Sequence, residues 1–171
     1  AATRKKAEIP WRFDEIRYEG EGIYIGIPKV SSQRRKYIPL GFVYDGMIPG
    51  DKLYFVPTDS LFVFGVLMSQ FHNAWMRVVG GRLKSDYSYA NNIIYNNFVW
   101  PTSTDFQQKC IEDCAQAVLD ARMQYVGSTL ADLYDPDNEF LYPALTNAHQ
   151  ELDKAVEAAY GVEFGRDEQK I

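Results

Sequence analysis

The stretch 61–86 reads LFVFGVLMSQFHNAWMRVVGGRLKSD, and it combines a helical pattern with a strand-like one. Its apolar residues fall at the spacing of one helical face, which predicts a helix over 61–79. Asp59 or Ser60 can cap the start of that helix, and a pair of glycines can end it. From Arg82 onward the sequence alternates in the manner of a strand, so the helix leads directly into sheet structure.

On the N-terminal side, short apolar runs alternate with Gly and Pro, as strands and turns do. These runs predict strands at 22–27, 36–44 and 52–56, with a turn at 48–51. Further strands are expected after the helix, at 82–89 and 93–100. The 12 Tyr, 10 Phe and 3 Trp residues are many for this length, and they favour a strand-rich part.

The C-terminal part changes to a helical period. Residues 104–107, TDFQ, form a capping box, which predicts a helix that runs to about Tyr125. A short helix is expected after Ser128. A third helix should begin at Pro143 and end at Gly161, because Pro suits a first helical position and Gly suits a C-terminal cap.

The net charge of −5 conceals an uneven distribution. Residues 1–100 carry 13 Lys and Arg against 9 Asp and Glu, whereas residues 101–171 carry 5 against 14, giving net charges of +4 and −9. This division indicates two modules, of which only the first suits a phosphate backbone, although an ordinary uneven surface is the alternative. We therefore expect an α+β chain, with a mixed β/α domain at 1–102 and a truncated helical bundle at 103–171.

Patterns of a catalytic or metal site are missing from the sequence, including a Gly-rich phosphate loop, a nucleophile elbow and a His-x-x-x-His pair. Residues 135–139 lack the Gly and the distal Glu of a calcium site, so we expect a loop there. His72 and His149 are isolated on predicted helices and are interpreted as structural or surface residues. Cys110 and Cys114 are interpreted as small buried residues of a protein in a reducing cytoplasm, with no signal peptide or membrane-length apolar run.

A basic segment at 31–36, SSQRRK, joins hydroxyl residues to three successive cations. Hydroxyl groups and cations together can bind the phosphates of DNA. The candidates for contacts with the DNA backbone in this segment are Ser31, Ser32, Arg34, Arg35 and Lys36. A solvated basic turn is the alternative interpretation.

The predicted strand 82–89 is a second candidate for contact with DNA. Alternate side chains of a strand share one face, which here would carry Arg82, Lys84, Asp86 and Ser88. In the major groove, a cation can donate to guanine and a carboxylate can accept from cytosine N4. An ordinary solvated strand face could have the same composition.

Long strings of this sequence resemble MmeI-like restriction–modification enzymes. Three strings are similar to their target-recognition domain: SSQRRKYIPLGF (31–42), LFVFGVLMSQFHNAWMRVVGGRLKSD (61–86) and YNNFVWP (95–101). Two more are similar to the helical domain that follows it: CAQAVLDARMQYVGSTLADLYD (114–135) and AHQELDKAVEAAYG (148–161). In that family, one polypeptide carries a class I S-adenosylmethionine-dependent adenine-N6 methyltransferase, a recognition domain and often an N-terminal endonuclease.

The resemblance implies that this chain recognises double-stranded DNA for a methyltransferase domain of the same polypeptide. The methyl-donor and catalytic motifs are absent from the sequence, so we expect S-adenosylmethionine to bind the parent enzyme and not this fragment. By resemblance, Lys84 and Asp86 occupy the positions that read the base 3′ to the target adenine. Ser88 and Lys52 occupy those that read the base 5′ to it, and Arg82 joins the backbone contacts.

Two other functions stay open at this point. A stand-alone DNA-binding regulator would have the same basic features, and a protein-interaction scaffold could bind a peptide on an aromatic sheet. The chain begins without Met and ends in the charged stretch 165–171, so we expect a piece of a longer bacterial protein of the cytoplasm.

Overall fold

The alternating sequence near the start of the chain forms a three-stranded sheet. The computed structural model describes residues 21–163. In it, β1 (Tyr24–Pro28) lies between β3 (Gly41–Val43) and β4 (Leu53–Val56) and is antiparallel to both. Ile25 and Ile27 of β1 are at most 1% exposed, so the core of the N-terminal part forms around this central strand.

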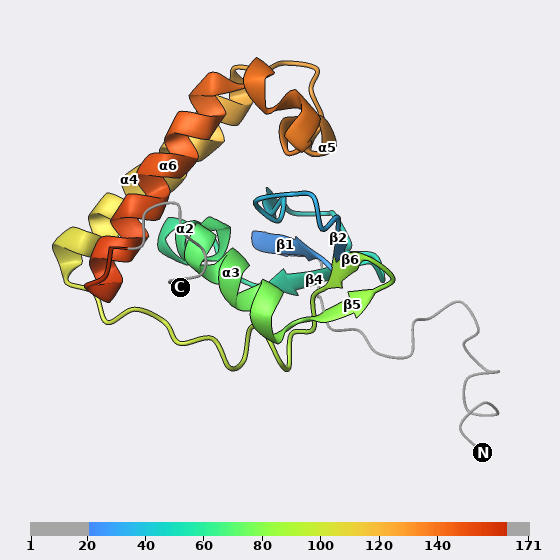
Figure 1. The fold of residues 1–171 in the computed structure, drawn as a ribbon, viewed down its shortest axis with the longest axis horizontal. Helices are drawn as coiled ribbons and strands as arrows, with labels where there is room; N and C mark the ends of the chain where they lie inside the picture. The colour runs from blue at the N-terminus through green and yellow to red at the C-terminus, as the bar shows by residue number, and fades with distance from the viewer. Residues whose placement is uncertain (1–20, 164–171) are drawn as a thin grey trace.

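A second three-stranded sheet lies beside the first (Figure 1). Its central strand β6 (Asp86–Ser88) is antiparallel to β2 (Val30–Ser31) on one side and to β5 (Gly81–Leu83) on the other. A single residue, Lys29, connects β1 to β2, and its N–H donates to the carbonyl of Lys52 at 2.9 Å. The end of the first sheet is therefore fixed next to the second.

The single predicted helix that follows residue 60 is two helices, α2 (Leu61–Met68) and α3 (Gln70–Val79). Ser69 separates them in an extended conformation with φ −68° and ψ 157°. Its hydroxyl accepts from the N–H of His72 at 3.3 Å and donates to the carbonyl of Val66 at 2.7 Å. Ser69 thus caps both helices at the break, because a serine side chain competes well with helical backbone hydrogen bonds.

We expect Ser69→Ala to lower the free energy of unfolding by about 1–2 kcal/mol. The hydroxyl is 0% exposed, so its loss leaves the N–H of His72 without this acceptor in the core. Ser60→Ala is the matched control, because Ser60 caps α2 through one bond to Val63 at a partly buried site. Urea unfolding measures both losses, and an equal loss for Ser60→Ala would contradict a special role of the buried cap.

The C-terminal part consists of α4 (Asp105–Met123), α5 (Leu130–Leu133), the 3-10 helix η1 (Pro136–Leu141) and α6 (Pro143–Tyr160). The predicted capping box is confirmed, since the side chains of Thr104 and Gln107 each bind the other's backbone N–H. Gly161 ends α6 at φ 69°, a left-handed conformation that Gly adopts easily. α4 and α6 lie side by side as a long helical hairpin, with α5 and η1 at one end (Figure 1). The α+β class is confirmed.

The predicted strand at 93–100 is wrong, because these residues form turns and irregular backbone. Ile94 and Phe98 are buried, at 0% and 6% exposure, but Asn96, which a strand would place on the same face between them, is exposed. The side-chain amide of Asn97 also donates to two backbone carbonyls of the same turns at 2.9 Å. These local bonds stabilise turns in place of a sheet.

Three smaller predictions also need correction. Within 36–44 only β3 pairs as a strand, because the backbone before it bonds mainly to side chains. Residues 135–139, predicted as a loop, lie largely in η1, which the side chain of Asp135 caps. Cys110 and Cys114 are free thiols as expected, but they are half-buried on α4 and not buried.

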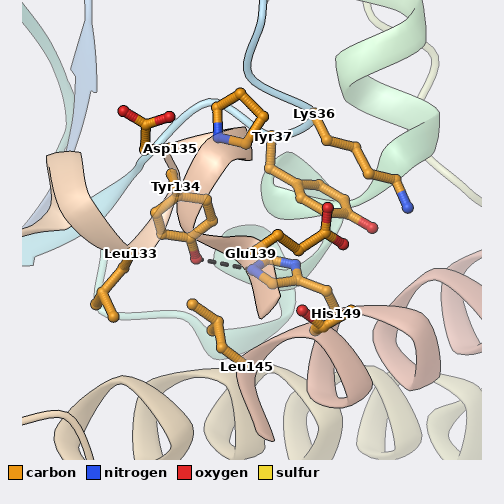
Figure 2. Close-up of a pocket in the computed structure, with 10 residues that line it drawn as sticks. Lys36, Tyr37, Leu133, Tyr134, Asp135, Glu139, Leu145 and His149 are labelled. Carbon is orange, nitrogen blue, oxygen red and sulfur yellow. Dashed lines mark hydrogen bonds between the residues drawn. The ribbon is translucent and has the colours of Figure 1, made fainter. Parts of the chain in front are cut away.

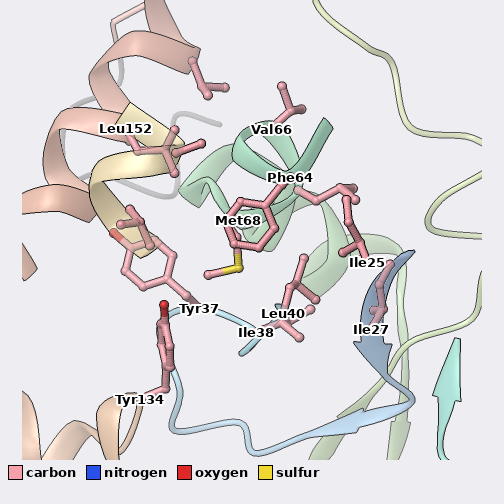
Figure 3. Close-up of a cluster of buried hydrophobic side chains, with 14 of the residues drawn as sticks. Ile25, Ile27, Tyr37, Ile38, Leu40, Phe64, Val66, Met68, Tyr134 and Leu152 are labelled. Carbon is pink, nitrogen blue, oxygen red and sulfur yellow. The ribbon is translucent and has the colours of Figure 1, made fainter. Parts of the chain in front are cut away.

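One hydrophobic core runs through both parts of the chain. Phe64 of α2 lies between Ile25 of the sheet and Leu152 of α6 (Figure 3). A Cβ on Gly65 would lie 2.8 Å from Ile111 Cγ2 and 3.2 Å from Leu152 Cδ1, so only Gly allows α2 to approach the helical hairpin this closely. Because α2 is shared, the N-terminal and C-terminal parts pack as one body.

Both histidines are buried in this core, in agreement with the structural interpretation. His72 Nε2 lies 3.0 Å from the hydroxyl of Tyr89, and His149 Nε2 lies 2.7 Å from that of Tyr134. Burial lowers the pKa of His72 to about 3 and holds the pKa of His149 well below its ordinary value, so both rings are neutral at pH 7. Within residues 21–163, His, Cys, Asp and Glu side chains form no group of three or more that could hold a metal ion, and no helix is long and apolar enough to cross a membrane.

Candidate nucleic-acid interface

The predicted strand 82–89 is a β-hairpin, and this changes which side chains share a face. β5 and β6 are antiparallel, with Leu83 opposite Asp86. Lys84 and Ser85 form the turn between them, where Lys84 has a φ of 58°. Two-residue hairpin turns need such left-handed conformations, and they are usually marked by Gly or Asn. Lys and Ser carry no such mark, so the sequence predicted a continuous strand.

The predicted row of four side chains on one face is therefore wrong. Asp86 and Ser88 alternate along β6 and share one face. Arg82 lies on the opposite face with its cross-strand partner Tyr87, and the Arg82 guanidinium carbon is 3.9 Å from the centroid of that ring. Lys84 is exposed at the tip of the hairpin. The hairpin thus presents different groups on its two faces and at its tip.

The basic segment lies against this hairpin. The N–H of Gln33 donates to Asp86 Oδ1 at 3.3 Å, across 53 residues of sequence. Arg82 Nη1 lies 3.4 Å from Gln33 Oε1 and donates to the carbonyl of Ser85 at 2.9 Å. The structure therefore brings the two predicted features together, and we call the surface made by 31–36, the hairpin and Lys52 the candidate interface.

The candidate residues differ in exposure. The exposed ones are Arg34, Lys36, Lys52, Arg82 and Lys84, and the half-buried ones are Ser32, Arg35, Asp86 and Ser88. The side chain of Lys52 is 87% exposed and its Nζ lies 3.5 Å from Asp51 Oδ2. Ser31 is only 5% exposed, so its hydroxyl is the least able of the set to reach a phosphate directly.

Lys29 belongs to the same surface, although no pattern in the sequence points to it. Its carbonyl accepts from the N–H of Tyr89 at 2.9 Å, and its N–H donates to the carbonyl of Lys52 at the same distance. Its ammonium group lies 4.7 Å from the centroid of the Tyr54 ring. This position depends on pairing between distant parts of the chain, so a lone Lys after Pro28 gives no local signal of it.

Acidic residues of the C-terminal part approach the basic segment at Arg34. Its Nη2 lies 2.5 Å from Asp137 Oδ1, with both side chains more than half exposed, at 57% and 69%. The hydrogen bond and charge of Arg34 lower the pKa of the Asp137 carboxyl. Exposed ion pairs are weak, so a DNA phosphate can replace this carboxylate.

A small pocket lies where the basic segment meets the C-terminal helices (Figure 2). Lys36 and Tyr37 line it from one side, and Tyr134, Glu139 and His149 line it from the other. The ring of Tyr37 stacks on that of His149, with centroids 4.1 Å apart. These contacts, together with the bond between His149 and the hydroxyl of Tyr134, join the two parts of the chain.

Two family models match the chain. The model of the MmeI target recognition domain matches residues 1–102, and the model of the MmeI C-terminal domain matches residues 103–171. Among curated proteins, DNA methyltransferase A of Bacillus subtilis (strain 168) is 36% identical over 170 residues. That alignment covers 99% of this chain and 19% of the relative.

A solved structure of the Type IIL restriction-modification enzyme MmeI in complex with DNA has the same fold. It superposes with a TM-score of 0.91 at 41% identity, and the match covers 98% of this chain and 22% of that protein. The chain thus spans about a fifth of the length of these relatives. On both sequence and structure, this chain belongs to the MmeI family, with a target recognition domain followed by a C-terminal domain.

Proposed function

We propose that this chain recognises the DNA sequence at which a methyltransferase of a restriction–modification system acts. The observation that carries the proposal is the union of the basic segment and the hairpin in one surface, in a chain of the MmeI family. Residues 1–102 would act as the recognition domain and residues 103–171 as its helical support.

We assign the methyl transfer itself to other parts of the parent polypeptide. A class I S-adenosylmethionine-dependent domain would methylate N6 of an adenine, with or without a fused endonuclease, in the bacterial cytoplasm. Such a domain must take the adenine out of the stack to reach its exocyclic nitrogen. The present chain would hold the duplex in register and read the bases beside that adenine.

Within the interface, we assign contacts with phosphates to Ser32 and the cations of the basic segment, together with Arg82. The base contacts are assigned to the tip and one face of the hairpin. Lys84 at the tip can donate to guanine O6 and N7, and Asp86 at the start of β6 can accept from N4 of the paired cytosine. Ser88 and Lys52 are assigned to the base on the 5′ side of the adenine.

This assignment implies guanine on the 3′ side of the methylated adenine. In the parent enzyme, we expect Lys84→Glu combined with Asp86→Arg to change that base from guanine to cytosine, because the donor and the acceptor exchange places. Each mismatched pair should cost about 1–3 kcal/mol of binding. Mapping methylated adenines in DNA exposed to each enzyme is the measurement. An unchanged site in the double variant, or a native site without guanine there, would refute the assignment.

The affinity of the 171-residue chain for duplex DNA should fall steeply as the salt concentration rises. Measuring this dependence tests the proposed function itself. Replacing Arg34, Arg35 and Lys36 by Ala should reduce the slope of log Kd against log salt by about 2–3, at roughly 0.9 for each phosphate contact. Lys109→Ala with Lys154→Ala is the control, because these exposed cations pair with acidic neighbours on α4 and α6. An undiminished slope in the triple variant would contradict a place for the basic segment in the interface. A wild-type chain without salt-dependent binding to duplex DNA would favour a protein-interaction scaffold.

A further inference from the structure

The backbone that carries the cations of the basic segment lacks the hydrogen bonds of a helix or a strand. Residues 32–40 form turns and irregular backbone. Nevertheless, Tyr37, Ile38 and Leu40 are at most 7% exposed and belong to the core. An irregular segment that enters a core needs partners for its backbone polar groups. Side chains of α3 and of the C-terminal helices provide them.

Helix α3 provides the first partners. The guanidinium group of Arg77 donates to the carbonyls of Arg35 and Lys36. Asn73 Oδ1 accepts from the N–H of Ile38 at 2.8 Å. Asn73 is itself 0% exposed and donates to a backbone carbonyl at the start of its own helix, so its amide group is held in one orientation. These bonds fix the position of the backbone at the cations.

The C-terminal helices provide the second partners. Arg122 of α4 donates to the carbonyl of Leu40 at 2.8 Å and to the hydroxyl of Tyr134 at 2.6 Å. The hydroxyl of Tyr134 is also bound to His149 of α6, on which the ring of Tyr37 stacks (Figure 2). The residue that follows the three cations is thus enclosed by the acidic part of the chain.

Asp153 of α6 connects these two sets of contacts. Its Oδ2 accepts from the hydroxyl of Tyr37 at 2.6 Å, and its Oδ1 accepts from the N–H of Gln70 at 2.7 Å. Gln70 is the first residue of α3, the helix whose side chains bind the backbone on either side of Tyr37. The carboxylate is 7% exposed, and both of its bonds are charge-assisted when it is ionised. One side chain of the C-terminal part therefore ties together the segment and the helix beside it.

We propose that Asp153 and Tyr37 are positioning residues for DNA binding, through which the C-terminal helices order the basic segment without contacting phosphates themselves. This proposal rests on the proposed function of that segment. The net charge of −9 over residues 101–171 opposes broad contact between the helices and DNA, so an indirect contribution fits their composition. Ordering the cations before binding reduces the entropy lost when DNA binds.

Tyr37→Phe tests the proposal with the least disturbance, because the ring can keep its stacking on His149 while the bond to Asp153 is lost. In duplex binding by the 171-residue chain, we expect an affinity about three- to tenfold lower. The slope of log Kd against log salt should also fall by about 1, because the disordered cations make fewer phosphate contacts. A role in folding alone would lower stability without changing this slope.

Tyr160→Phe is the matched control, since it removes a hydrogen bond of equal length, 2.6 Å, from the hydroxyl to the carbonyl of Val99. It should leave both affinity and slope unchanged. Asp153→Ala should reproduce the effect of Tyr37→Phe. Asp153→Asn should restore binding, because its amide oxygen can still accept from Gln70 and its NH₂ group can donate to the Tyr37 oxygen.

Hydrogen exchange measures, in the absence of DNA, how far the bond between Tyr37 and Asp153 orders residues 32–40. Exchange at residues 32–40 should rise in Tyr37→Phe and not in Tyr160→Phe. Wild-type affinity and slope in Tyr37→Phe, with the wild-type chain binding DNA, would overturn this proposal and leave the proposed function intact. A wild-type chain that shows no salt-dependent binding would overturn both. Equal effects of the two Tyr→Phe variants on affinity and slope would show a general loss of stability and would also overturn the positioning role.

Discussion

Leu152→Ala is expected to lower the free energy of unfolding of the whole described chain by about 3–4 kcal/mol. Leu152 is 0% exposed on α6, at the place where α2 passes closest to the helical hairpin. Truncation removes apolar contact with α2 and leaves a cavity. Because α2 already lies close to the hairpin at Gly65, the surrounding helices can move little to fill that cavity. Because α2 also packs on the sheet, the loss of stability should affect both parts of the chain.

Two probes distinguish one cooperative unit from two independent domains. All three Trp residues precede residue 103, so their fluorescence reports on the N-terminal part, whereas helical circular dichroism reports largely on α4 and α6. In Leu152→Ala, both urea midpoints should fall together. Leu141→Ala, at a residue 50% exposed, is the control and should change stability by less than about 0.5 kcal/mol. A lower urea midpoint by circular dichroism, with an unchanged midpoint by Trp fluorescence, would contradict a shared core.

Asp153 is expected to make the stability of the chain fall as the pH rises from about 4 to above 6. Burial, as the largest cause, raises the pKa of its carboxyl from 3.8 to about 6, even though the hydrogen bonds from Tyr37 and Gln70 and the charge of Lys36 act in the opposite direction. Glu157, also on α6, adds to the rise. The folded state thus holds this proton more tightly than the unfolded state does. The contribution is fully present below pH 3.8 and is lost as the pH passes 6.

The full pH effect of Asp153 corresponds to roughly 3 kcal/mol, of which about half should appear between pH 5 and pH 8. Asp153→Asn removes the titration and keeps the shape of the side chain. Urea unfolding of both proteins at pH 5 and pH 8 gives the measurement, because the other carboxylates titrate equally in each. Relative to wild type, the variant should gain stability toward pH 8. A difference that does not depend on pH would show that Asp153 titrates normally in the folded chain.

The identity of the proposed base-recognition residues could be predicted from the sequence, but their arrangement could not. The resemblance named Lys84, Asp86 and Ser88, and they do lie on one hairpin. Their arrangement follows from the turn at Lys84, where the sequence has no Gly or Asn to indicate a turn. Lys29 was missed because its neighbours on this surface are distant in sequence. The assignment of these residues to DNA bases stays a prediction.

The α+β class and most features of the C-terminal helices could be predicted from the sequence. A capping box at Thr104, a left-handed Gly161 and a helical period are local signals, since helical hydrogen bonds join residues close in sequence. The break at Ser69, the hairpin and the course of residues 36–40 could not be predicted, and they were found only in the folded chain. In the last of these, the backbone is bound by Arg77, Asn73 and Arg122 from distant helices, and long-range partners of this kind leave no periodic pattern in a sequence.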